Sequence, residues 1–356
     1  MSSSELFFFK GQINVIENSD NGKEPIDKIK ESFNKILDGK NLSFLLGSGC
    51  SSYQTEIQSS RTKEKSFSSV EVGIPTMLPL AKEFYTSELN DSEKKWLKGT
   101  LLIDIDNNKF LKNIEFFLGV LHSYKFYLSN TISSSSNEIK LERLENIILK
   151  AKNFLIRKCL NEDNRNSGKD YELSQLYEKF YRKLLYRNSN LPKANIFTTN
   201  YDLYSETALD KLGIHYVNGF SGGIKKYFNP TIFNYALAEK MDLSQSKWNV
   251  IDNFFYLYKI HGSINWIEDV NDSKLFKVRE IQETSYNHLK SQGTTMIHPT
   301  PLKQNASLGS PYADLFREFQ KKLMQNNNIL ITLGYSFSDE HIIILFIKLL
   351  QYLRLD

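Results

Sequence analysis

The chain has 356 residues, of which 40% are hydrophobic and 24% charged, with a net charge of +4. This is the composition of an ordinary globular protein with a core of its own, which excludes a disordered or fibrous chain. The mild charge gives no indication of direct nucleic-acid binding, and two cysteines, Cys50 and Cys159, are too few for a disulfide framework or a paired-cysteine zinc site.

Two short apolar segments could be mistaken for targeting or membrane elements. Residues 5–10, "ELFFFK", are far too short for the core of a secretory signal. Residues 342–350, "IIILFIKLL", reach about half the length of a membrane span and include Lys348. We therefore expect a cytoplasmic protein with no membrane partner, which agrees with its few cysteines.

The first predicted elements follow a polar lead-in at 1–27 that contains "NSDNGKE". Residues 26–37 carry apolar side chains at helical spacing, and Gly39 ends this helix. The segment "NLSFLLGSG" at 41–49 indicates a buried strand that runs into a glycine turn, and the polar residues 52–72 indicate a loop.

Helical patterns then dominate as far as about residue 187. We interpret the stretch from about 77 to 190 as a large helical insertion, divided by polar connections. Its parts are the opening helix at 73–85, the periodic runs at 141–155 and 173–184, and the connections at 129–138 and 161–170.

Short apolar runs typical of buried strands follow the helical region, and helical segments at 203–212 and 312–325 lie between several of them. Alternating strands and helices predict an α/β fold, a Rossmann-like parallel sheet with helices on both faces, in one domain over residues 28–356. Aromatic residues make up 13% of the chain, so a core rich in Phe and Tyr is expected. The runs are "ANIFTT" (194–199), "FFYLYKI" (254–260), "TTMIH" (294–298) and "NILITLG" (328–334).

Polar residues follow four of the predicted strands. In an open parallel sheet, ligands bind beyond the carboxyl ends of the strands, so these four groups should converge on one crevice. They are Gly47-Ser48-Gly49-Cys50-Ser51, Thr198-Thr199-Asn200-Tyr201-Asp202, His261-Gly262-Ser263 and Gly334-Tyr335-Ser336-Phe337-Ser338-Asp339.

The glycine turn at 47–51 has two interpretations. Glycines let a phosphate approach the backbone, and a helix that starts at Ser51 or Ser52 would offer free N–H groups to it. However, Ser52 stands where the third glycine of the common dinucleotide fingerprint would be, and no clear acidic partner follows. A plain strand-to-helix turn explains the same residues, with Cys50 as a small packed side chain.

Asn200 and Asp202 are unusual at the end of a core strand. An amide can orient a water or a ribose hydroxyl, and a carboxylate can accept hydrogen bonds from a carboxamide. For Asp202 an Asx-type turn that caps the helix at 203–212 is a serious alternative. For Asn200 a functional role is favoured.

His261 is the histidine best placed for chemistry. It follows a predicted strand, and Gly262 beside it leaves room for a ligand. A histidine there can act as a base near neutral pH. A lone histidine is more often structural, and His341 is interpreted as a helix-start residue.

The four motifs, in this order, resemble the sirtuin fold family, and more closely the sirtuin-like domains of bacterial antiphage defence proteins. The family's G-A-G-x-S motif corresponds to residues 47–51, with Ser48 in place of Ala. Its T-T-N-Y-D motif is intact at 198–202, its H-G pair is His261-Gly262, and its G-Y-S-F-S-D-x-H-I run is 334–342. The resemblance covers roughly residues 28–342, and the ordered set is more specific than any one motif.

The resemblance implies a role for each matching residue, with NAD as substrate. It implies that Asn200 orients the nicotinamide ribose and a water, that Asp202 meets the carboxamide, and that His261 acts on ribose hydroxyls or on water. These three residues are the expected catalytic set. The residues implied to contact the dinucleotide are Gly47, Ser48, Gly49 and Ser51 at the diphosphate, Thr199, Asn200, Tyr201 and Asp202 beside the nucleotide, and Gly334 and Ser336 near the adenosine ribose.

Two departures from the family pattern matter. Deacylating sirtuins usually carry a four-cysteine zinc module, which two cysteines cannot build, so no metal is expected. The family usually continues past "DEHI" with an asparagine and a further strand, whereas this chain continues with "IILFIKLLQYLRLD". The contacts to adenine are therefore in doubt.

The leading hypothesis is an NAD⁺ glycohydrolase of antiphage defence, which releases nicotinamide and ADP-ribose. Nicotinamide leaves readily because its ring is already cationic, and departure leaves an oxocarbenium-like ribose. Alternatives are a non-catalytic scaffold that binds NAD or ADP-ribose, a sirtuin-type deacylase, and nucleic-acid cleavage, which no acidic metal-binding cluster supports. The resemblance further implies a homo-oligomer and activation on infection, with a hexameric DNA-translocase-type ATPase as one candidate partner.

Overall fold

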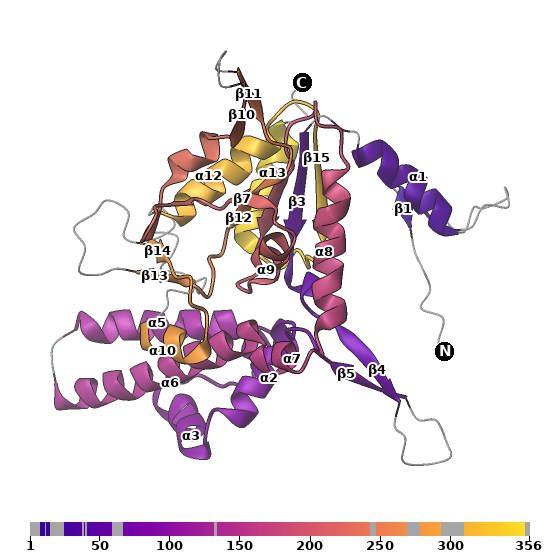
Figure 1. Ribbon diagram of the computed structural model, residues 1–356. Helices are drawn as coiled ribbons and strands as arrows, with labels where there is room; N and C mark the ends of the chain where they lie inside the picture. Colours follow the sequence, from indigo (N-terminus) through magenta and orange to yellow (C-terminus); the bar gives the residue numbers. More distant parts are fainter. Residues whose placement is uncertain are drawn as a thin grey trace.

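A computed structural model gives the structure of the chain (Figure 1). It describes residues 8–10, 12–14, 25–37, 39, 41–58, 67–131, 134–242, 247–268, 278–292 and 310–352. The strand expected at 294–298 lies outside these residues.

A five-stranded parallel sheet forms the centre of one half of the molecule, in the order β15-β3-β6-β12-β7. Its strands are short and rich in Ile, Leu, Phe and Tyr, as expected for strands that are covered on both faces. The register aligns the last residues of the middle strands, because Leu46 pairs with both Thr198 and Leu333. The strands are β3 (Asn41–Leu46), β6 (Asn195–Thr198), β7 (His215–Val217), β12 (Phe254–Lys259) and β15 (Asn328–Leu333).

Helices cover both faces of this sheet, so the predicted Rossmann-like α/β fold is confirmed. On one face α8 (Tyr171–Leu185) and α9 (Tyr204–Lys211) pack over β3, β6 and β12. On the other face lie α12 (Tyr312–Leu323), α13 (Glu340–Tyr352) and the short 3₁₀ helix η2 (Pro230–Asn234). Leading into β3 is α1 (Pro25–Leu37), which lies where the sequence predicts a helix.

The core is aromatic, as the composition predicts. The Phe197 and Tyr258 rings stack at 4.4 Å between centroids, and the edge of Phe319 from α12 meets Phe197 at 4.6 Å. Each such pair adds roughly 0.5–1.5 kcal/mol beyond the area that it buries. Buried rings thus fix α12 against the sheet.

The inserted helices form the other half of the molecule, below the sheet in Figure 1. They share a separate hydrophobic core, which Leu203 and Ile264, just beyond two sheet strands, also join. The last helix of the predicted insertion, α8, packs on the sheet instead. The inserted helices that contribute to this core are α2 (Met77–Ser87), α3 (Asp91–Thr100), α4 (Asn108–Leu111), α5 (Ile114–Ser129) and α6 (Ser135–Leu160), and α10 (Tyr286–Gln292) packs against the same core. The short α7 (Glu162–Asn166) follows α6 and has no buried residue. We call α2–α7 the helical unit.

Short antiparallel pairs complete the described chain. The loop expected at 52–72 is wrong, because β4 (Gln54–Gln58) and β5 (Phe67–Glu71) form a hairpin there. The connection expected at 161–170 likewise contains α7. The other strands are β1 (Phe9–Lys10) with β2 (Ile13–Asn14), β10 (Ala238–Asp242) with β11 (Lys247–Val250), and a sheet of β8 (Phe220–Ser221), β9 (Lys226–Phe228), β13 (Trp266–Glu268) and β14 (Val278–Glu280).

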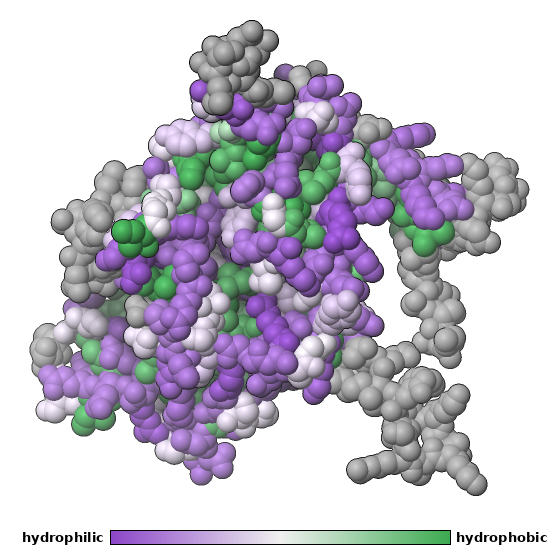
Figure 2. All heavy atoms as spheres, viewed as in Figure 1, coloured by the Kyte–Doolittle hydropathy of each residue, from purple (hydrophilic) through white to green (hydrophobic). Residues whose placement is uncertain are grey.

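The surface is mainly hydrophilic on the face shown in Figure 2, and several hydrophobic patches lie over the half that contains the sheet. None of the helices in the described ranges is long and apolar enough to cross a membrane.

Candidate functional site

A cleft of about 450 Å³ lies between the carboxyl ends of the sheet strands and the helical unit. All four strand-end groups contribute to it, so the structure brings them together as the sequence predicts. The sheet side is polar, whereas residues of α2, α5 and α6 form a mainly apolar wall. The polar side includes Ser51, Asn200, Asp202, His261, Ser336 and Asp339, and the apolar wall includes Met77, Leu80, Phe116 and Leu155. Of the other expected site residues, Ser48, Thr199 and Tyr201 also line the cleft.

The glycine turn after β3 does not lead into the α-helix that the sequence suggests. It forms the three-residue 3₁₀ helix η1 (Ser48–Cys50), and the chain then enters the β4–β5 hairpin. The backbone N–H groups of Gly47, Gly49, Cys50 and Ser51 all donate to backbone oxygens of the chain itself. The expected helix N-terminus for a diphosphate is therefore wrong, and Ser48 is the residue of this turn whose exposed side chain lines the cleft.

The glycines of this turn are needed for contact between two parts of the chain. A Cβ on Gly47 would lie 2.5 Å from the carbonyl oxygen of Gly334, and a Cβ on Gly334 would lie 2.4 Å from the nitrogen of Cys50. Gly334 also has a φ of +58°, which favours glycine. Gly47, Gly49 and Gly334 thus let the turns after β3 and β15 pack backbone against backbone.

Ser51 is the centre of a buried hydrogen-bond network. Its hydroxyl donates to Asp202 Oδ2 at 2.7 Å and accepts from Asn200 Nδ2 at 3.1 Å. The Tyr177 hydroxyl of α8 lies 2.8 Å away, and because the single Ser51 proton is already used, Tyr177 donates to it. Burial, followed by the charge of Asp202, raises the pKa of Tyr177 well above its usual value, so this donor stays protonated.

Asn200 combines a fixed position with an unused acceptor. Its backbone N–H donates to Thr198 Oγ1 at 3.0 Å, and its side-chain NH₂ is held by Ser51. Within the described part of the chain, Oδ1 is buried and has no hydrogen-bond partner, although the residue lines the cleft. A buried carbonyl oxygen without a donor is costly, so this atom marks where a ligand group or a water would bind.

Asp202 fits both of its interpretations. Oδ1 accepts from the backbone N–H of Tyr204 at 3.0 Å, which is the Asx-type turn at the start of α9. Oδ2 accepts from Ser51, and the residue lines the cleft. The carboxylate therefore starts the helix and also fixes the network that holds Asn200.

His261 follows β12 and lies in the same cleft as Asn200. Its Nε2 lies 2.7 Å from Oδ2 of Asp339, which comes from the turn between β15 and α13. Gly262, with a φ of +92°, allows the tight turn that presents His261. A carboxylate at one ring nitrogen orients the imidazole and supports a positive charge on it.

Glu115 is a site residue that the sequence does not single out. Asn113 caps α5 by accepting from the backbone N–H of Glu115 at 2.9 Å, which fixes the glutamate in the first turn. The Tyr201 hydroxyl then donates to Glu115 Oε1 at 2.9 Å, and burial raises the pKa of Tyr201 well above its usual value. The helical unit is thereby tied to the residue next to Asn200.

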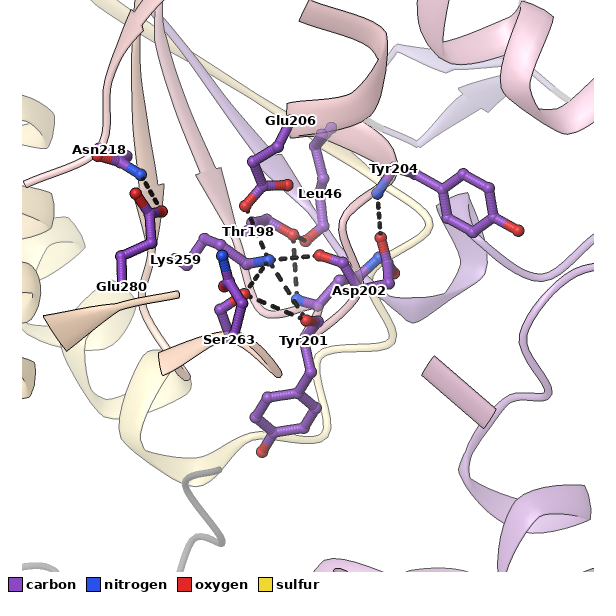
Figure 3. A network of polar contacts seen from close by, with 12 residues as sticks. Leu46, Thr198, Tyr201, Asp202, Tyr204, Glu206, Asn218, Lys259, Ser263 and Glu280 are labelled. Carbon is purple, nitrogen blue, oxygen red and sulfur yellow. Dashed lines mark hydrogen bonds and ion pairs between the residues drawn. The ribbon is translucent and has the colours of Figure 1, made fainter. Parts of the chain in front are cut away.

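A buried lysine contacts the backbone of Tyr201 and Asp202, two residues that line the cleft (Figure 3). Lys259, the last residue of β12, is 2% exposed, and its Nζ lies 3.0 Å from Glu206 Oε1 on α9. A charged residue among the apolar residues of "FFYLYKI" was the signal in the sequence that could have identified it. Burial is the main cause that raises the pKa of Glu206, and Lys259 opposes it.

The described ranges contain no group of three His, Cys, Asp or Glu side chains that could hold a metal ion. Among curated proteins, no protein matches the chain.

A family model does match part of the chain. Residues 194–352 match the model of the SIR2-like domain, and this segment contains Asn200, His261, Gly334 and Asp339 but not the glycine turn at 47–51. SIR2-like domains are typical of enzymes that use NAD. Residues 194–352 are therefore similar to a SIR2-like domain, and this similarity supports a sirtuin-like family for the chain.

Proposed function

We propose that the protein hydrolyses NAD⁺ at the bond between nicotinamide and ribose. The matched SIR2-like segment, the polar strand ends and the apolar wall of the helical unit all support a dinucleotide substrate in this cleft. The observation that carries the proposal is Asn200 Oδ1, a buried acceptor without a partner among the described residues, in the cleft that also holds the His261–Asp339 pair.

The cleft fits the substrate in size and in chemistry. A volume of about 450 Å³ is within the range of small-molecule sites. The apolar wall suits a pyridine ring, and the hydroxyls of Ser48 and Ser336 suit sugar or phosphate oxygens.

The chemistry requires little from the protein. The oxygen of water bonds to C1′ of the ribose, the C1′–N bond breaks with its electron pair leaving on neutral nicotinamide, and one proton is released. In this proposal Asn200 Oδ1 accepts a hydrogen bond from the attacking water or from a ribose hydroxyl. His261, supported by Asp339, takes the proton.

The test is chromatography of NAD⁺ after incubation with Asn200→Ala, His261→Ala and the unchanged protein. Each substitution should lower nicotinamide release by about 100-fold or more, as expected for the loss of a positioned donor, acceptor or base. The melting temperature of Asn200→Ala should stay close to that of the unchanged protein, because the substitution also removes the buried unpaired oxygen. His288→Ala on α10, outside the cleft, is the matched control and should keep the full rate.

The same experiment separates the alternatives. If a variant that combines Asn200→Ala with His261→Ala depletes NAD⁺ at the parent rate, the assignment of these two residues is wrong. If the unchanged protein binds ADP-ribose and releases no nicotinamide, the scaffold interpretation replaces hydrolysis. An acetylated peptide that yields O-acetyl-ADP-ribose would instead indicate a deacylase.

The proposal extends to a role in antiphage defence, in an oligomer and with an ATPase of the DNA-translocase type as partner. The ordered motifs at 47–51, 198–202, 261–262 and 334–342 support this part through their resemblance to such defence domains. Cells that carry the unchanged gene should resist phage and lose NAD⁺ on infection, whereas cells with Asn200→Ala should do neither. Equal plaque numbers on both strains would refute it, and native mass measurement reports the oligomer.

A further inference from the structure

The ammonium group of Lys259 contacts two separate segments of the cleft. It donates to the carbonyl oxygen of Tyr201 at 3.3 Å and also to that of Asp202, which are the two residues after Asn200. It also donates to Ser263 Oγ at 2.8 Å, and Ser263 comes two residues after His261. Figure 3 shows these contacts and the ion pair with Glu206 meeting at one nitrogen atom.

Further hydrogen bonds fix the two segments to each other around this nitrogen. The backbone N–H of Ile264 donates to the Tyr201 carbonyl at 3.1 Å, and Ser263 Oγ lies 3.4 Å from the same oxygen. The backbone N–H of Gly262 donates to the Lys259 carbonyl at 3.0 Å, which closes the turn that carries His261. One side chain thus lies between the loop of Asn200 and the turn of His261.

The stability of the fold does not by itself require the ion pair between Lys259 and Glu206. Burying an ammonium and a carboxylate carries a large desolvation cost, and apolar residues of similar volume often stabilise a protein as well or better. Glu206 is 7% exposed, and its Oε2 has no hydrogen-bond partner among the described residues. The contacts of Lys259 with the two cleft segments are what apolar residues could not reproduce.

We propose that Lys259 is a positioning residue that holds the Asn200 loop and the His261 turn in their mutual arrangement, with Glu206 as its counter-charge. The inference rests on the proposed function for its kinetic consequence. Lys259 is not among the described residues that line the cleft, and it acts through the Tyr201 and Asp202 carbonyls and the Ser263 hydroxyl.

The main variant is the double substitution Lys259→Met with Glu206→Leu. Lys259→Met alone would leave an unpaired buried carboxylate, and the resulting loss of stability would obscure the kinetic result. The double variant removes both charges together. Its kcat for nicotinamide release should fall by about 100-fold, the size expected when reacting groups are misplaced by about 1 Å, while KM stays within about threefold.

The matched control is Lys193→Met with Asp252→Leu. This ion pair, at 2.5 Å, joins the residues just before β6 and β12, so it connects the same two strands at their amino ends, away from the cleft. Its removal should leave kcat unchanged.

Hydrogen exchange gives a readout that does not depend on activity. In the Lys259/Glu206 double variant, the N–H groups of Ile264 and Tyr204 should exchange faster, since their acceptors belong to the Asn200 loop. The N–H groups inside α6 should not change. If the unchanged protein releases no nicotinamide, the proposed function fails, and exchange still decides the positioning role.

Ser263→Ala covers the case in which the double variant does not fold. It removes one of the contacts of Lys259 and should lower kcat by about fivefold without changing KM, as expected for one lost hydrogen bond. The proposal is overturned if the Lys259/Glu206 double variant folds, keeps kcat within threefold of the parent value and shows unchanged hydrogen exchange at Ile264 and Tyr204. If the double variant does not fold, an unchanged kcat in Ser263→Ala would overturn the proposal instead.

Discussion

The ends of β3 and β6 lie side by side in the sheet and carry two quite different kinds of turn. After β3, four of the five backbone N–H groups at 47–51 donate to backbone oxygens of the chain itself. The backbone of Gly334 occupies the space that a Cβ on Gly47 or Gly49 would need. After β6, the Asn200 side chain keeps a buried oxygen without a partner in the described residues. Most backbone donors of the first turn are satisfied within the chain, whereas the second turn carries a buried acceptor with no partner among the described residues.

This difference separates two signals that look equally functional in a sequence. The glycines at the end of β3 are explained by packing, because a Cβ on Gly47 or Gly49 would collide with the backbone of Gly334. A polar strand end is not explained by packing when one of its atoms stays unsatisfied. The chemistry of this cleft is therefore expected to depend on the β6 and β12 ends more than on the β3 end.

Of the substitutions that test this difference between the two turns, Gly334→Ala should have the largest effect on stability. The new Cβ would meet backbone atoms of Gly49 and Cys50, and φ at this position is +58°. We expect the free energy of unfolding to fall by at least about 3 kcal/mol, measured by urea or thermal unfolding.

Gly99→Ala is the control for Gly334→Ala. Gly99 lies in α3, and apart from the adjacent residues and the backbone of its own helix, a Cβ there would meet no described atom within 4 Å. This substitution should raise stability by up to about 1 kcal/mol, because alanine is the better helix former. A Gly334→Ala variant as stable as the parent would show that the two turns do not need their close approach.

Ser51→Ala should have an intermediate effect, and it sharpens the comparison because Ser51 belongs to the β3 end but bonds to the β6 end. The substitution leaves Tyr177, Asn200 and Asp202 without their shared partner. We expect a loss of roughly 1–3 kcal/mol in unfolding free energy, together with reduced nicotinamide release.

Ser48→Ala is the companion control for Ser51→Ala. Its side chain is exposed at the cleft, so the unfolding free energy should change by less than about 0.5 kcal/mol. Equal melting temperatures for the Ser51 and Ser48 variants would contradict the buried network.

The smallest effect concerns Cys50, within the β3 turn. Burial raises the pKa of its thiol from 9.0 to about 11, and Sγ donates to the Leu333 carbonyl. Since only the thiolate reacts, alkylation of the folded protein at pH 8 should be about 100-fold slower than that of a thiol with the unshifted pKa, and it should accelerate as the pH rises toward 11.

Mass spectrometry of a Cys159→Ala variant after iodoacetamide treatment measures the Cys50 reaction alone. The same variant unfolded in urea supplies the reference rate. A folded-state rate at pH 8 as fast as the urea rate would show that Cys50 is exposed and reactive, contrary to its packed position.

Much of the fold was predictable because it depends on local pattern. The apolar runs at 41–46, 195–198, 254–259 and 328–333 are strands, and the alternation with helices indicates the parallel sheet. The β4–β5 hairpin was missed because its polar residues lack an apolar alternation. The place of α8 on the sheet is not predictable, because an apolar stripe indicates that one helix face is buried but not which core it faces.

The site was predictable where one strand end carries several polar residues in succession, as at Asn200 and His261. What sequence alone could not supply were partners far apart in the chain. Tyr177 and Glu115 come from two different helices, and only the fold brings them against Ser51 and Tyr201. Lys259 stands out in the sequence as a charged residue in an apolar run, but its contacts with Glu206 and with the Asn200 loop come only from the fold.

The place of β3 has a consequence for dissecting the chain. The segment that matches the SIR2-like domain begins at residue 194, yet β3 lies between β6 and β15 and pairs with both. A fragment cut at that boundary would lack β3, so β15 would be separated by the width of one strand from the remaining strands β6, β12 and β7. Truncated variants, domain swaps and fusions should therefore retain residues 41–46, because the sheet that carries the cleft is assembled from segments that are not contiguous in the chain.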